Sequence, residues 1–152
     1  MGGVAKRSEL LRHGNSRDSI DLAATYQRHL ICVRNGWYAA TGTSADVLRA
    51  WRLGGRLACV SAAAHHGLIL PNADSFHLCV PRNASRLSRL EPGVTVHWTD
   101  RQSLEDCPYG DRAATTLEES IVQIGKCQAA EAAVVLRAWA ASVPRAGATD
   151  NL

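Results

Sequence analysis

Apolar and polar residues alternate over residues 31–34 and 37–40, on either side of the dipeptide Asn35-Gly36. Alternation of this kind predicts β-strands that are buried on one face. Asn-Gly is typical of two-residue hairpin turns of type I′, because both central residues of such a turn need a positive φ. The pattern therefore predicts a β-hairpin with a type I′ turn at its tip.

Two stretches with helical spacing precede this hairpin. Residues 6–13 and 16–30 each place apolar side chains on one face, and Ser16 is a typical N-cap for the second helix. Two short helices followed by a hairpin are typical of a winged helix-turn-helix, which we expect over residues 1–42. A winged helix normally has one more helix in front. Because the chain starts at Met1, we expect that helix to be missing or very short and the winged helix to be truncated.

The rest of the chain switches between helical and extended patterns. The periodicity predicts helices at residues 45–53, 61–66, 116–125 and 128–141, strands at 76–80 and 94–98, and an extended segment at 56–60. We therefore expect an α+β protein in which the truncated winged helix is followed by a small α/β lobe (residues 43–143) and a flexible tail (residues 144–152).

The positive charge of the chain is concentrated at its N-terminal end. The whole chain has a net charge of +3, and residues 1–36 contain six basic and three acidic side chains, so this segment accounts for the entire excess. A basic segment of this kind favours an anionic partner such as nucleic acid, although a merely solvated surface would have the same composition.

The cysteines and histidines show no ligand spacing along the sequence. The five cysteines are scattered and contain no C-x-x-C pair: Cys32, Cys59, Cys79, Cys107 and Cys127. Apolar surroundings favour core packing for most of them. His65 and His66 are adjacent, so on a helix they point about 100° apart and cannot both hold one metal ion well. We therefore expect no metal site and no cofactor.

The composition, 46% hydrophobic and 20% charged, is that of a globular protein. No apolar run reaches the roughly 20 residues of a membrane helix, and the N-terminus has no signal-peptide core. We expect a cytoplasmic protein with no membrane partner. No spacing of a nucleophile and a base is present, which argues against an enzyme.

Three segments carry a resemblance to a known family. They are Val33-Arg34-Asn35-Gly36-Trp37-Tyr38, the segment from Ser61 to Leu68, and Val80-Pro81-Arg82-Asn83. In this order and spacing, over roughly residues 2–141, the chain is similar to the antitoxin-like regulators of the AbiEi family from type IV toxin–antitoxin systems. The nearest likeness is to the actinobacterial branch, in which this region often precedes a nuclease-like domain that we do not find in this chain.

The resemblance implies a winged helix that binds promoter DNA, followed by an α/β lobe. On that interpretation Arg17, Ser19 and Arg28 lie on the recognition helix, and Arg34 and Asn35 form the tip of the wing. A second basic patch between the two predicted strands of the lobe contains Arg82, Arg86 and Arg89. We expect the first two of these to contribute to binding double-stranded DNA.

Two alternatives remain open besides a sequence-specific repressor, whether antitoxin-like or of phage or prophage origin. In the first, the α/β lobe binds and neutralises a protein partner, such as a toxin, through the loop around Arg82 or the last helix. In the second, histidines and cysteines form an enzyme site. We also expect a homodimer, because Leu10, Leu11 and Ile20 need cover that the missing front helix would have given, and because Val134 belongs to an apolar stripe on the last helix.

Overall fold

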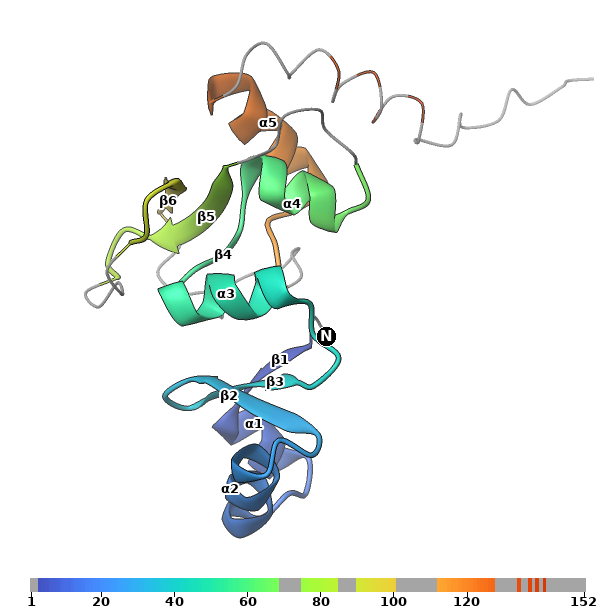
Figure 1. Ribbon diagram of the computed structural model, residues 1–152, viewed down its shortest axis with the longest axis vertical. Helices are drawn as coiled ribbons and strands as arrows, with labels where there is room; N and C mark the ends of the chain where they lie inside the picture. The colour runs from blue at the N-terminus through green and yellow to red at the C-terminus, as the bar shows by residue number, and fades with distance from the viewer. Residues whose placement is uncertain are drawn as a thin grey trace, which may run out of the picture.

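The computed structural model describes residues 3–68, 75–84, 90–100 and 112–127, together with residues 134, 137, 139 and 141. Helices and two small sheets follow each other along this part of the chain (Figure 1). The α+β class predicted from the sequence is therefore correct. Most of the predicted helix at 128–141, and the predicted tail at 144–152, lie outside the described residues.

The first sheet is built from residues at the N-terminal end. Its three strands are antiparallel in the order β1-β3-β2, so the first strand pairs with the last one. The elements are β1 (Val4–Lys6), α1 (Arg7–Arg12), α2 (Arg17–Thr25), β2 (Leu30–Arg34) and β3 (Trp37–Ala40). The helices and the hairpin were predicted, whereas β1 was not, because three residues are too few to show an alternating pattern.

The second helix is shorter than predicted. Ser16 caps it as expected, since its Oγ accepts the backbone N–H of Ser19. The helix ends at Thr25 rather than near residue 30, and Gln27 has a positive φ of 46°. A residue in the left-handed region cannot continue a right-handed helix. Arg28, which we expected on the helix, therefore lies in the loop that leads to β2.

The hairpin is present, but its turn is not of type I′. Gly36 has a φ of 78°, whereas Asn35 is not among the described residues with positive φ. The pairing also shifts between Cys32 and Arg34, which shows a β-bulge in β2. The predicted turn type was wrong, because a type I′ turn needs a positive φ at both central residues and here only Gly36 has one.

Helix α3 (Ala45–Leu53) lies on the opposite side of the first sheet from α1 and α2 (Figure 1). The ring of Trp51 packs against that of Trp37 in β3, with 4.6 Å between the ring centroids. The indole Nε1 of Trp51 also donates to the backbone oxygen of Arg112, at 3.0 Å. A buried tryptophan thus joins α3 both to the first sheet and to the segment before the last described helix.

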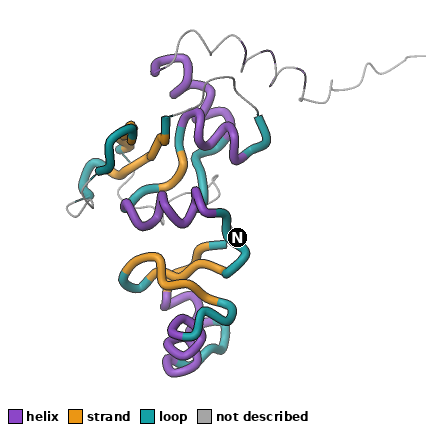
Figure 2. The backbone as a smooth tube through the Cα atoms, in the orientation of Figure 1, coloured by secondary structure: helices purple, strands orange, loops and turns teal. Residues whose placement is uncertain are grey.

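The second sheet lies beyond α3 (Figure 2). Its order is β4-β5-β6, in which β4 and β5 are antiparallel and β5 and β6 are parallel. The strands are β4 (Arg56–Leu57), β5 (Phe76–Pro81) and β6 (Val94–Thr99), and the helices packed beside them are α4 (Cys59–His65) and α5 (Leu117–Cys127). Cys59 and Val60 belong to α4, so the prediction that they are extended was wrong.

One hydrophobic cluster runs through both sheets and α3. Its buried members come from either side of the boundary predicted after residue 42, and include Val4, Val33, Ala39, Val47, Ala50, Trp51, Leu57, Leu78 and Val80. The boundary itself stays a prediction. None of the helices in the described part of the chain has the length and apolar character that crossing a membrane would require.

Candidate functional site

Helix α2 is attached to the first sheet by Arg7, the first residue of α1. The Nε of Arg7 donates to the hydroxyl of Tyr38 in β3, at 3.0 Å, and its guanidinium forms an ion pair with Asp21 of α2. Ile20 on the inner side of α2 is 1% exposed. The helix is thus held by one ion pair and one buried side chain, and Arg17 lies in its exposed first turn.

The residues predicted to lie on the recognition helix occupy different places. Arg17 is the first residue of α2 and is exposed. The hydroxyl of Ser19 donates to the backbone oxygen of Ser16, at 2.9 Å, so this side chain takes part in the helix cap. Arg28 is exposed in the loop after the helix. The side chains of Arg17 and Arg28 therefore lie near opposite ends of α2.

The predicted wing residues lie at the hairpin tip. Arg34 ends β2 and is half-buried, and Asn35 is exposed. A hollow of about 400 Å³ separates the hairpin tip from α2. Its lining includes Arg7, Asp21 and Asn35. Residues of α2 and of the hairpin tip therefore line one hollow, Asn35 among them. We use the name α2–wing surface for the predicted DNA-binding residues on or next to these two elements: Arg17, Arg28, Arg34 and Asn35.

The second predicted basic patch belongs to another part of the molecule. Arg82 directly follows β5, a strand of the second sheet, and that sheet and α2 lie on opposite sides of α3 (Figure 1). Arg82 is exposed, and its Nε is 2.8 Å from a carboxylate oxygen of Asp100. Arg86 lies outside the described residues. The structure does not bring Arg82 to the α2–wing surface.

Two of the three acidic groups in residues 1–36 are held in ion pairs. Asp21 is paired with Arg7, and Glu9 accepts from the two terminal nitrogens of Arg112 at 2.5 and 2.6 Å. The hydrogen bond from Arg112, opposed by partial burial and reinforced by the backbone N–H of Lys6, lowers the pKa of Glu9 to about 2. The pair of Arg7 and Asp21 leaves the net charge of the segment unchanged, whereas Glu9 is neutralised by Arg112, which lies outside the segment.

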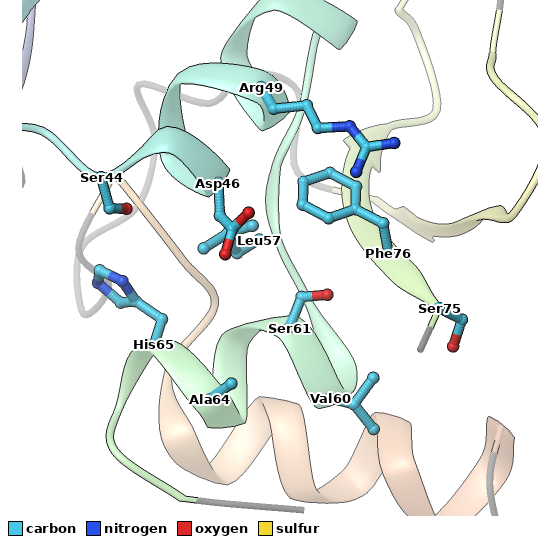
Figure 3. A pocket seen from close by; sticks show the side chains of 10 residues that line it. All are labelled: Ser44, Asp46, Arg49, Leu57, Val60, Ser61, Ala64, His65, Ser75 and Phe76. Atoms are coloured by element: carbon cyan, nitrogen blue, oxygen red, sulfur yellow. The ribbon is translucent and has the colours of Figure 1, made fainter. Parts of the chain in front are cut away.

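A polar hollow of about 380 Å³ opens between α3, α4 and the start of β5 (Figure 3). The guanidinium of Arg49 lies over the ring of Phe76, 4.2 Å from its centroid, and forms an ion pair with Glu91 at 2.6 Å. Asp46 and His65 also line the hollow. The charge of Arg49 is thus balanced by Glu91.

Two thiol and two imidazole side chains lie close together where the start of α4 and the end of α5 meet the second sheet. We call them the Cys–His cluster: Cys59, His77, His97 and Cys127. One donor atom from each lies within 4.8 Å of the others. They come from the start of α4, from β5, from β6 and from the end of α5. Sequence spacing could not have indicated this cluster, because each member lies on a different element.

Two members of the cluster, Cys59 and His77, are buried, and His97 is half-buried. Burial, and to a lesser extent the neighbouring His97, lower the pKa of His77 to about 4, and burial also lowers the pKa of His97. Burial likewise raises the pKa of the Cys59 thiol to about 12, with a further contribution from Cys127. Each shift favours the neutral form of the group. Cys127 itself is exposed.

No family model and no curated protein sequence matches this chain. The likeness to AbiEi-type regulators therefore depends only on the sequence segments quoted above.

Proposed function

We propose that this chain is a sequence-specific DNA-binding transcriptional regulator of the repressor or antitoxin-like type, and that it is not an enzyme. The observation that carries the proposal is the connectivity of the N-terminal elements. A helix pair with a short turn is followed by a hairpin, and the three strands pair in the order β1-β3-β2. A winged helix-turn-helix has this order of elements, with its second helix in the major groove and its hairpin against the adjacent backbone.

The charges of the α2–wing surface support this function. Arg17 and Arg28 are exposed at opposite ends of α2, and Arg34 lies at the hairpin tip. Arginine side chains in these places can contact phosphates on either side of a groove, and such contacts supply much of the affinity for DNA. The N-terminus of α2 lies next to Arg17, and backbone N–H groups at a helix N-terminus favour an anion.

The apolar residues of the helix pair are partly or fully covered within the described chain. Ile20 is buried, and Leu10 and Leu11 are half-buried. The need to cover these residues was one of two reasons to expect a homodimer, and the chain meets that need by itself. The second reason, the apolar stripe on the last helix, concerns residues of which only a few are described. A homodimer on paired half-sites stays part of the proposal because symmetric binding suits operator DNA.

The test compares charge reversals at the two ends of the molecule. Arg34→Glu and Arg17→Glu are measured against Lys126→Glu, which makes the same change of net charge on α5. We expect both α2–wing variants to weaken binding to all DNA sequences and to reduce the salt slope of log K by about one unit. We expect Lys126→Glu to leave the slope unchanged. Fluorescence anisotropy on DNA from around the chain's own gene gives both quantities.

If Arg34→Glu and Arg17→Glu bound DNA with the same affinity and the same salt slope as the wild type and Lys126→Glu, the α2–wing surface would be excluded from DNA binding. The length of the footprint distinguishes one half-site from two and so tests the homodimer as well. Circular dichroism shows whether a variant has kept its fold. An acidic residue in the first turn of a helix is favourable, so Arg17→Glu is not expected to harm α2.

A protein-binding function is the second candidate, favoured by one observation. Trp98 on β6 is 52% exposed, and tryptophan is enriched at protein interfaces. In that case a partner such as a toxin would bind the second sheet. Trp98→Ser would then abolish partner binding and leave DNA binding unchanged.

A further inference from the structure

The donor types in the Cys–His cluster are those of a zinc site. Two thiolates and two imidazoles form one of the common ligand sets of Zn²⁺, which binds them in a tetrahedron at about 2.3 Å for sulfur and about 2.0–2.1 Å for nitrogen. Four protein ligands fill the coordination sphere. The set is therefore typical of a structural ion and not of a catalytic one, which keeps one position open.

The distances between donors are close to those of a tetrahedron. Nδ1 of His77 is 3.0 Å from Nε2 of His97 and 4.0 Å from Sγ of Cys127. Ideal edges for the bond lengths of zinc are about 3.3 Å between two nitrogens and about 3.6 Å between nitrogen and sulfur. All four donor atoms lie within 4.8 Å of one another, which is at most about 1 Å more than a sulfur–sulfur edge and can be closed by side-chain rotation.

A neighbouring hydroxyl holds His77 in a suitable orientation. Oγ of Ser75 and Nε2 of His77 are 2.7 Å apart. When Nε2 donates its proton to this oxygen, the lone pair of the ring is on Nδ1, the atom that faces the cluster. Hydrogen bonds of this kind commonly fix the tautomer of metal-binding histidines.

The backbone around the cluster is also held in place. The two histidines lie on the same side of the parallel pair β5 and β6, two positions apart in register. The N–H of Cys59 donates to Oε1 of Gln123 in α5, at 2.8 Å, which joins the start of α4 to the helix that ends at Cys127. Cys59 has a φ of 50°, a conformation that non-glycine residues adopt only where the surrounding contacts impose it.

We propose that one Zn²⁺ ion binds in a tetrahedral structural site formed by the Cys–His cluster, Cys59, His77, His97 and Cys127. The ion connects α4, α5, β5 and β6, and its ligands Cys59 and Cys127 are 68 positions apart in the sequence. Binding draws the end of α5 onto the second sheet and stabilises the lobe, because the ligands come together only in the folded chain. The site is independent of DNA binding.

The first test measures metal binding directly. The full chain is purified under reducing conditions, stripped with a chelator and titrated with Co²⁺ and then Zn²⁺. We expect one equivalent of Co²⁺ to give the intense visible bands of a tetrahedral site and a thiolate charge-transfer band, and Zn²⁺ to displace it. Zinc at about 100 times its Kd should raise the melting temperature by about 5–10 °C.

Variants connect the signal to the named side chains. We expect Cys127→Ser to lower the charge-transfer intensity by about half and the affinity at least about tenfold, since one of two thiolates is lost. His97→Gln should keep both thiolates and still lose affinity. Cys32→Ser and His29→Gln are matched controls, because both residues are exposed and outside the cluster, and we expect both to bind like the wild type.

Cys127 is exposed at a helix end, so Cys127→Ser is expected to fold, and circular dichroism checks this. Residue-resolved alkylation gives a second measurement on the unmodified chain, in which zinc should protect Cys127 but not Cys32, although both are exposed. Binding below half an equivalent, equal cobalt spectra in wild type and Cys127→Ser, or alkylation unaffected by zinc would overturn the proposal. A disulfide between Cys59 and Cys127 that forms in air, with no zinc binding after reduction, would overturn it as well.

Discussion

Gly36 shows how a single backbone conformation fixes the tip of the hairpin. Its φ is 78°, and a Cβ placed there would meet nothing within 4 Å. Space is therefore available for a side chain, and only the left-handed conformation opposes one. The hairpin tip depends on glycine for its conformational freedom.

We predict that Gly36→Val lowers the free energy of unfolding by about 1–3 kcal/mol, because a β-branched residue is strained at positive φ. Gly36→Asn should cost less, since asparagine tolerates this region. Gly42→Val is the matched control, as Gly42 has open space but no positive φ. Chemical denaturation measures all three variants. Equal midpoints for Gly36→Val and Gly36→Asn would show that the turn relaxes without strain.

At the scale of elements, α2 is held in place by polar contacts as well as by packing. Arg7 contacts both Asp21 on the helix and Tyr38 on the sheet. Ile20 supplies the apolar contact on the inner side. The position of α2 relative to the first sheet therefore depends on both the polar contacts of Arg7 and the packing of Ile20.

We predict that Arg7→Ala increases the hydrogen-exchange rate of the α2 backbone amides and leaves those of β5 unchanged. The reason is that this change removes the hydrogen bonds and the ion pair that connect Asp21 in α2 with Tyr38 in β3, so local opening becomes easier there. Arg12→Ala is the control on the same helix, because Arg12 contacts only the nearby backbone oxygen of Ser8 among the hydrogen bonds of the described residues. Unchanged exchange in α2 would show that packing alone holds the helix.

For the whole molecule, the pair of Glu9 and Arg112 connects the first helix with the segment before α5. The two residues are 103 positions apart, and the side chains are only partly exposed. Arg112 also receives the indole N–H of Trp51 at its backbone oxygen. The first helix, α3 and the segment before α5 therefore meet at one point.

The lowered pKa of Glu9 makes this contact dependent on pH. Its pKa is about 2 in the folded chain and near its ordinary value, about 4.3, when unfolded. A lowered folded pKa stabilises the fold above the unfolded value, and this contribution is lost as the pH falls from about 5 to 2. We predict that Glu9→Gln removes about 1–3 kcal/mol at neutral pH and much less near pH 2.

Thermal melts of wild type and Glu9→Gln across this pH range test the prediction. Glu118→Gln, which removes an exposed carboxylate in the first turn of α5, is the control. A difference between wild type and Glu9→Gln that stays constant from pH 7 to pH 2 would contradict it.

The sequence by itself determined the elements with strong local patterns. The helix at Ala45–Leu53 was predicted with its cap at Ser44, and the strands beginning at Phe76 and Val94 were predicted from their alternation. The hairpin around Gly36 was also correct in place, though not in turn type. Local propensity and periodicity suffice here because each of these segments contains its own signal.

Only the tertiary structure decided which distant segments meet. β1 forms a strand because it pairs with β3, with Val4 opposite Ala39. α4 begins at Cys59, where the chain turns at a positive φ. Arg28 lies outside α2 because that helix ends at Thr25 and Gln27 has a positive φ. The Cys–His cluster has no signal along the chain, since its members are brought together by the parallel pairing of β5 with β6 and by the packing of α4 on α5. Contacts of this kind are set by how elements pack, and local periodicity contains no information about them.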